Sequence, residues 1–98
     1  MRVEVSEQVL AFVRRQAPEP RRRLRLALRG LEAERGDIKV LEGPLRGYCR
    51  LRVEPYRILF TVADAPGGDS VRCLFAERRD VVYSVFSDAL RARLLKDA

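Results

Sequence analysis

The chain has 98 residues, 47% of them hydrophobic, and 20 Lys and Arg residues against 14 Asp and Glu give a net charge of +6. This composition excludes intrinsic disorder, and the length predicts one domain spanning residues 1–98. Histidine and tryptophan are absent. The missing histidine excludes Ser–His and Cys–His catalysis and the usual metal sites, so we expect no metal and no cofactor. No run approaches the ~20 apolar residues of a membrane span. The amino terminus also lacks a signal peptide's apolar run, so we expect a cytoplasmic protein without membrane contact.

Arginine supplies nearly all of the positive charge, because Lys39 and Lys96 are the only lysines. The planar guanidinium can bind a phosphate through two parallel hydrogen bonds. A basic domain of this size therefore indicates a nucleic acid or an acidic partner, unless the arginines only reflect genome composition and a solvated surface. Cys49 and Cys73 lie in apolar runs without zinc-ligand spacing, which predicts reduced core residues.

Two helices are predicted in the first half of the chain, after a short strand at residues 1–5. Ser6 is the expected N-cap of the first helix, which ends at the prolines of residues 17–20. The second helix is expected to run to about Arg35, with Gly36 as its C-cap. Its outer face carries a run of arginines that is either a solvated face or a binding surface: Arg21, Arg22, Arg25 and Arg29.

The second half predicts three strands and a helix. The strands are expected at 47–53, 56–63 and 70–77, with a loop at 64–69, and the helix from an N-cap at Ser87. The fold class is therefore α+β: an N-terminal strand, a helical hairpin, a three-stranded antiparallel meander and a C-terminal helix.

Alternation in the first two meander strands separates an apolar face from an arginine face. If the turn centres on Glu54-Pro55, Val53 lies opposite Tyr56 and Arg52 opposite Arg57. One face then carries Cys49, Leu51, Val53, Tyr56, Ile58 and Phe60, and the other carries Tyr48, Arg50, Arg52 and Arg57. In the third strand Val71, Cys73 and Phe75 are expected on the apolar face and Arg72 on the other, with Arg78 following at its end.

Like charges directly opposite on a sheet destabilise it, so the arginine face requires compensation. Carboxylates at Glu54, Glu77 or Asp80 would provide it internally, whereas a bound polyanion would provide it in use. A two-residue hairpin turn usually needs positive φ, which Glu-Pro does not favour. A longer symmetric loop would keep the Arg52–Arg57 pairing, and an odd-length loop would change it.

The run "GYCRLRVEPYRI" and the later "RRDVVY" resemble the RelE/ParE superfamily of bacterial toxins from toxin–antitoxin pairs, over nearly the whole chain. The resemblance implies a compact α+β fold and a neutralising antitoxin that wraps the toxin. RelE-type members cleave messenger RNA in the ribosomal A site without metal, whereas ParE-type members inhibit DNA gyrase.

The resemblance also implies site residues. Arg50, Arg52 and Arg57 match the family's basic positions on the hairpin, either Arg78 or Arg79 matches the arginine after the last strand, and Tyr83 matches the carboxy-terminal tyrosine. We predict Arg57, Arg78 or Arg79, and Tyr83 as catalytic. We predict Tyr48, Arg50, Arg52 and Arg72 as RNA- or phosphate-binding.

Metal-free RNA cleavage would use the guanidiniums to stabilise charge on the phosphorane. Nearby arginines would favour the phenolate form of Tyr83, which makes it the predicted base, with Arg78 or Arg79 assisting the leaving group. The alternative for Tyr83 is a packing role between sheet and helix, and Tyr48 is either a base-stacking residue or a rim residue.

Three functions follow as alternatives. The favoured one is a ribosome-dependent endoribonuclease. The others are a gyrase inhibitor and an inactive regulatory member that binds an antitoxin and, as a hetero-oligomer, operator DNA.

Overall fold

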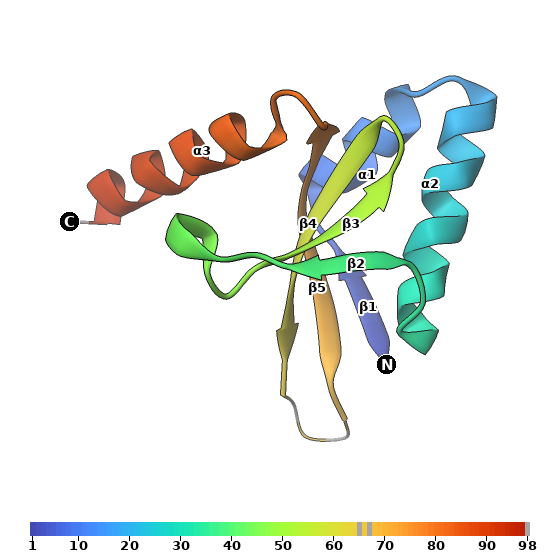
Figure 1. Ribbon diagram of the computed structural model, residues 1–98, viewed down its shortest axis with the longest axis horizontal. Coiled ribbons are helices and arrows are strands. Elements are labelled where there is room, and N and C mark those ends of the chain that lie inside the picture. Colours follow the sequence, from blue (N-terminus) through green and yellow to red (C-terminus); the bar gives the residue numbers. More distant parts are fainter. Residues whose placement is uncertain (65, 67, 98) are drawn as a thin grey trace.

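The computed structural model combines three α-helices with a five-stranded sheet among residues 1–64, 66 and 68–97, with side chains described to residue 93. Figure 1 shows α1 and α2 together at one side of the sheet and α3 projecting from the other. The helices are α1 (Glu7–Arg15), α2 (Pro18–Gly30) and α3 (Val82–Asp97), with single 3₁₀ turns at Leu31–Ala33 and Gly43–Leu45. The strands are β1 (Arg2–Val5), β2 (Asp37–Val40), β3 (Cys49–Val53), β4 (Tyr56–Ala63) and β5 (Ser70–Arg78). The α+β class is confirmed. No helix in these described ranges is long and apolar enough to span a bilayer.

The sheet has the order β1-β5-β4-β3-β2. Strands β3, β4 and β5 form the predicted antiparallel meander, and β1 joins β5 in parallel. Sequence analysis assigned no element to residues 37–42, so β2 was missed. This strand pairs antiparallel with β3 and all four of its residues are exposed. It is short and buries no side chain, so its sequence carries little strand signal.

Two helix boundaries differ from the prediction. The α2 helix ends at Gly30 instead of Arg35, because the chain tightens into a 3₁₀ turn that buries Leu31 and then enters the left-handed region at Glu34 (φ 56°). The α3 helix begins at Val82 and not near Ser87. Val82 and Phe86 are buried one turn apart, so core packing starts the helix before the predicted cap. Ser6 is confirmed as the N-cap of α1, and its Oγ accepts a hydrogen bond from the Val9 amide at 3.2 Å.

Each face of the sheet carries its own apolar cluster. The larger cluster packs α1 and α2 against the sheet and contains all six residues of the predicted apolar face. The second cluster packs α3 onto the opposite face through Leu59, Val82 and Phe86. The predicted face is therefore confirmed.

A β-bulge in β5 moves Phe75 to the opposite face from its predicted one. Cys73 lies opposite Phe60 and Phe75 opposite Leu59, which leaves Leu74 as the extra residue. The α1 helix holds the bulge, because Ser6 Oγ donates to the Leu74 carbonyl at 2.9 Å. Gln8 bonds both backbone groups of Ala76 at 2.8 Å. Phe75 consequently packs in the second cluster instead of beside Cys73.

The two cysteines are free and face the larger cluster, as predicted. Cys49 and Cys73 both lie opposite Phe60, one on each side of β4, so a strand separates them. Burial raises the pKa of the Cys73 thiol to about 12 and also raises the pKa of Cys49. Both are therefore protonated packing residues at neutral pH.

Candidate functional site

The β3–β4 hairpin places the predicted arginines on one face. Val53 lies opposite Tyr56, so only Glu54 and Pro55 form the turn, joined by a cis peptide bond. Neither residue of this turn adopts a positive φ. Arg52 therefore lies directly opposite Arg57, confirming the predicted register.

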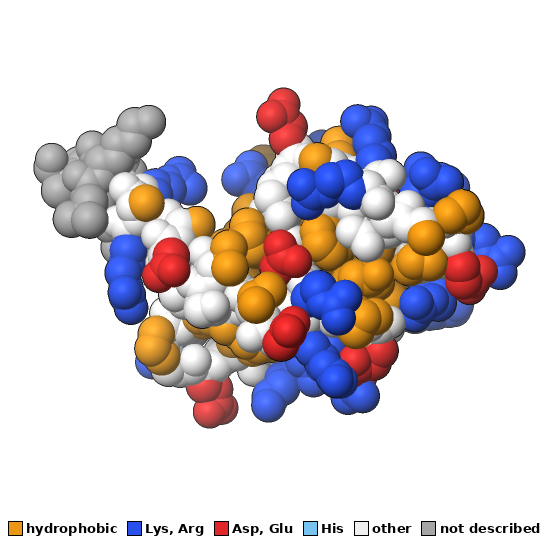
Figure 2. All heavy atoms as spheres, turned by 90° about the horizontal axis from the view of Figure 1, so that it is seen from above, with side chains coloured by type: hydrophobic (Ala, Val, Ile, Leu, Met, Phe, Trp, Pro, Cys, Tyr) orange, Lys and Arg blue, Asp and Glu red, His pale blue; other side chains and the backbone are white. Residues whose placement is uncertain are grey.

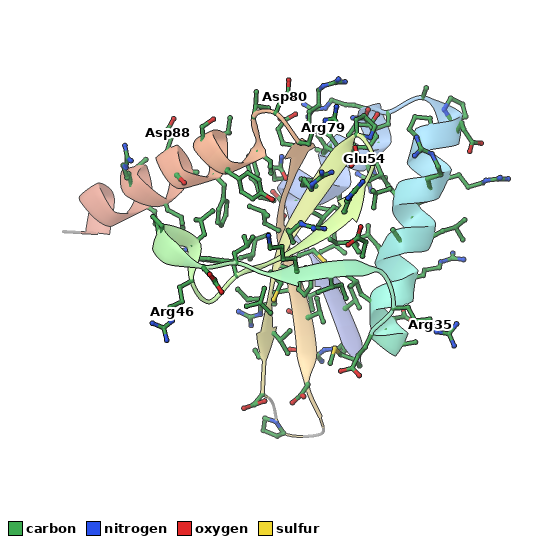
Figure 3. All side chains as sticks on the ribbon, in the orientation of Figure 1. Arg35, Arg46, Glu54, Arg79, Asp80 and Asp88 are labelled. Carbon is green, nitrogen blue, oxygen red and sulfur yellow. The ribbon has the colours of Figure 1, made fainter. Side chains whose placement is uncertain are left out.

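Glu54 in the turn binds three guanidiniums. Its Oε1 lies 2.7 Å from Arg52 Nε and 3.1 Å from Arg57 Nη2, and its Oε2 lies 3.2 Å from Arg79 Nη1. Figure 3 shows Glu54 and Arg79 close together where the β3–β4 turn meets the end of β5. One carboxylate thus compensates the repulsion between the opposed arginines.

Asp37 on β2 is the second carboxylate partner. Its Oδ1 lies 3.2 Å from Arg50 Nη1 and its Oδ2 lies 3.7 Å from Arg52 Nε. We call Arg50, Arg52, Arg57 and Arg79 the arginine cluster. Glu54 was among the carboxylates expected to compensate it, but Asp37 was missed because β2 was missed. The four-residue alternation "DIKV" ahead of the Gly43 turn gave only a weak signal for this strand.

The structure distinguishes Arg79 from Arg78. Arg79 joins the cluster, and its amide donates to the Pro55 carbonyl at 2.9 Å. Arg78 lies opposite Tyr56, on the face of the larger cluster, and its Nε lies 3.9 Å from Asp80 Oδ1. Glu77 lies opposite Arg57, but its carboxylate accepts the Arg78 amide at 3.0 Å.

Arg72 lies outside the arginine cluster. It shares the sheet face with Arg57 but lies opposite Thr61, four residues further along β4. Its Nε lies 3.3 Å from Glu4 Oε2 on the neighbouring strand β1. Four strand residues span about 13 Å, so Arg72 and Arg57 do not meet at one phosphate.

Both predicted tyrosines are half-buried against the second apolar cluster. The Tyr48 ring meets the Phe86 ring edge-on, with centroids 5.1 Å apart. Tyr83, in the first turn of α3, packs on the cluster that contains Leu59, two residues from Arg57 on the same face of β4. Tyr83 and the arginine cluster thus share one side of the sheet.

The side chains of the arginine cluster are partly buried, and each forms an ion pair with Glu54 or Asp37. The side chains of Arg50 and Arg57 are 15% and 13% exposed, whereas Arg52 and Arg79 are 46% and 62% exposed. Four guanidiniums face two carboxylates, so two positive charges remain uncompensated. Desolvation would raise the pKa of Glu54, but the Arg57 hydrogen bond and the charges of Arg57, Arg52 and Arg79 outweigh it and lower that pKa below its usual 4.5.

Glu54→Gln is expected to flatten the acid limb of the pH–stability profile. Because folding lowers the pKa of Glu54, its stabilisation is present above pH 4.5 and is lost as pH falls through the lower folded pKa. Wild type should lose more stability than Glu54→Gln between pH 6 and pH 3, as measured by urea unfolding. The control Glu42→Gln changes an exposed glutamate outside the cluster and should follow wild type. Parallel profiles for wild type and Glu54→Gln would contradict the ion pairing.

Comparisons with known proteins place this geometry in a known fold. No protein-family model and no curated protein sequence matches the chain. A YoeB/ParE toxin from Agrobacterium tumefaciens matches with a TM-score of 0.65 and 14% identity, covering 81% of this chain and 99% of that one. The RelB-RelE antitoxin–toxin complex from Methanococcus jannaschii matches with a TM-score of 0.59 and 20% identity, covering 85% and 98%. The RelBE2 toxin–antitoxin complex from Mycobacterium tuberculosis matches with a TM-score of 0.58 and 21% identity, covering 80% and 96%.

These structural neighbours place the chain in a class of small α+β proteins. Within that class, the chain has the RelE/ParE toxin fold.

Proposed function

We propose that this protein is the toxin of a type II toxin–antitoxin pair and that it cleaves messenger RNA on the ribosome without metal. The observation that carries the proposal is the convergence of four arginines at one end of a rigid sheet, with Tyr83 on the same side. Rigid placement matters because catalytic charges act best when they need no rearrangement during the reaction.

Each group has a role in the proposed reaction. Tyr83 takes the proton from the 2′-hydroxyl, whose oxygen then forms a bond to phosphorus. Arg57 and Arg79 stabilise the negative phosphorane. The bond from phosphorus to the 5′-oxygen then breaks with Arg79 assisting the leaving group, and a 2′,3′-cyclic phosphate remains. The leaving oxygen takes up a proton from solvent, and Tyr83 returns its proton to solvent. Arg50 and Arg52 bind flanking phosphates. Glu54 is a weak base because its pKa is lowered, so its role is to orient the guanidiniums.

The ribosome is the proposed positioning partner. A tyrosine base is poorly matched to neutral pH, so the site should be slow on free RNA. Holding the messenger in the reactive geometry would recover rate by removing the entropic part of the barrier. Two of the structural neighbours are complexes with an antitoxin. We therefore include a cognate antitoxin among the partners, with operator DNA as a ligand of the hetero-oligomer, in a cytoplasmic setting.

One observation favours a second candidate, a ParE-like inhibitor of DNA gyrase. Arg50 and Arg57 are mostly covered and already paired with carboxylates, as structural arginines would be. One structural neighbour also carries ParE in its name. A regulatory member without either activity is the third candidate.

A cleavage assay on programmed ribosomes, run beside a gyrase supercoiling assay, separates these candidates. Tyr83→Phe is expected to slow messenger cleavage by about 100-fold or more, because it removes the proton acceptor. The matched control is Tyr56→Phe, which removes a hydroxyl bonded to Gln16 on the opposite face and should keep cleavage near wild type. Cleavage that survives Tyr83→Phe rejects the base assignment. Gyrase inhibition without cleavage selects the second candidate, and neither activity selects the third.

A further inference from the structure

A second group of arginines lies on α2, which packs on the opposite face of the sheet from the arginine cluster. The helix carries five arginines and a single acidic residue, Glu19. With 3.6 residues per turn, Arg22, Arg25 and Arg29 fall within about 60° of arc, on the side away from the buried Leu24. We call these three residues, with the flanking Arg21, the α2 stripe. Figure 2 looks onto the end carrying the β3–β4 turn and shows Lys and Arg side chains gathered over α2 at the right.

The α2 stripe differs from the arginine cluster in its pairing. Among the described residues, its one ion pair joins Arg22 to Glu19 at 4.0 Å, with both side chains well exposed. The cluster arginines are instead held by Glu54 and Asp37 at distances down to 2.7 Å. The stripe therefore leaves its charge available to a partner, whereas much of the cluster's charge is compensated within the chain.

The stripe is also held in place by the fold. Leu24 and Leu31 are buried in the larger cluster, and Arg23 donates to the Glu54 carbonyl at 2.8 Å, which ties α2 to the hairpin turn. The segment from Arg22 to Arg29 spans about 10 Å along the axis of a straight helix. The α2 helix carries no aromatic side chain on which a base could stack. These features suit the regularly spaced phosphates of a rigid duplex better than a single strand.

We propose that the α2 stripe binds the phosphate backbone of double-helical nucleic acid, independently of sequence and separately from the arginine cluster. One part of this inference rests on the proposed function, namely the source of the duplex, which would be structured RNA of the ribosome. Arginine suits this role because each guanidinium can bind a phosphate through two hydrogen bonds. The stripe would seat the protein on a large RNA while the cluster contacts the messenger.

The test measures duplex binding by fluorescence anisotropy from 50 to 200 mM salt, using the full chain, a labelled RNA duplex and a DNA duplex of the same sequence. The Arg22→Gln/Arg25→Gln/Arg29→Gln variant is expected to weaken binding at least about tenfold at low salt. It should also lower the slope of log affinity against log salt by about 2 to 3, because each lost phosphate contact contributes about 0.9. The variant should fold, because these residues are exposed and glutamine is a good helix former.

The matched control removes the same charge elsewhere, through Arg2→Gln/Arg46→Gln/Arg91→Gln. It should keep most of the affinity and slope, and an equal loss in both variants would overturn the proposal. A stripe-dependent loss on both duplexes, or on RNA alone, supports it; a loss on DNA alone rejects the ribosomal source. Displacement of the duplex by poly-glutamate at equal charge concentration would show an acidic-protein surface and reject it. Duplex binding is measured without ribosomes and without cleavage, so failure of the nuclease proposal would not hide this result.

Discussion

Arg57→Ala is expected to reduce messenger cleavage on programmed ribosomes by about 100- to 1,000-fold, the usual cost of removing one donor to a developing negative charge. Arg57 has the least exposed side chain of the cluster, and its guanidinium pairs with Glu54, so the fold holds it in place. A loss of transition-state stabilisation should appear in kcat. Single-turnover cleavage at saturating ribosomes measures this term apart from binding.

Two further variants are compared with Arg57→Ala to interpret its effect on cleavage. Arg57→Lys keeps the charge but loses the forked donor, so only partial recovery is expected. Arg78→Ala removes an arginine that points to Asp80 instead of Glu54, so it should leave the cleavage rate near wild type. If Arg78→Ala impairs cleavage as severely as Arg57→Ala, the cluster is not the source of the effect. Glu54 keeps its ion pairs with Arg52 and Arg79 when Arg57 is lost, so the Arg57 variants should fold. Thermal melting checks that each variant does.

The hairpin was predictable because its determinants are local. Alternation in two strands fixed which residues share a face, and a turn on Glu54-Pro55 fixed the Arg52–Arg57 register. The apolar face followed from the same alternation and is confirmed in the larger cluster. The roles of Arg57, Tyr83 and the other site residues remain proposals, because they depend on activity and not on position alone.

The parts that sequence reasoning missed depend on contacts between distant segments. Asp37 reaches the cluster only because β2 pairs with β3. The bulge at Leu74 reverses the face of Phe75, and the bonds that hold it come from Ser6 and Gln8, nearly seventy residues away. The start of α3 was missed because a capping residue at Ser87 gave a stronger local signal than the buried Val82.

Leu59→Ala is expected to destabilise the protein by about 2 to 5 kcal/mol, the range found when a buried leucine leaves a cavity. Leu59 is fully buried and is the sheet's buried residue in the cluster beneath α3. Urea unfolding at neutral pH measures the loss as a lower midpoint with an unchanged slope. A domain of this size has only about 5 to 15 kcal/mol of stability, so the variant should lie close to its folding limit.

The matched control is Leu26→Ala, the same change at a leucine on α2 that is 56% exposed. It should shift stability by no more than about 0.5 kcal/mol, so the difference between the variants isolates packing from chemistry. Hydrogen exchange adds a local test. Because α3 meets the sheet through the second cluster, its amides should lose protection in Leu59→Ala before those of β4 and β5. Uniform loss across all elements would instead show that α3 and the larger core unfold as one unit. Tyr83 would then be held by the whole fold and not by the second cluster alone.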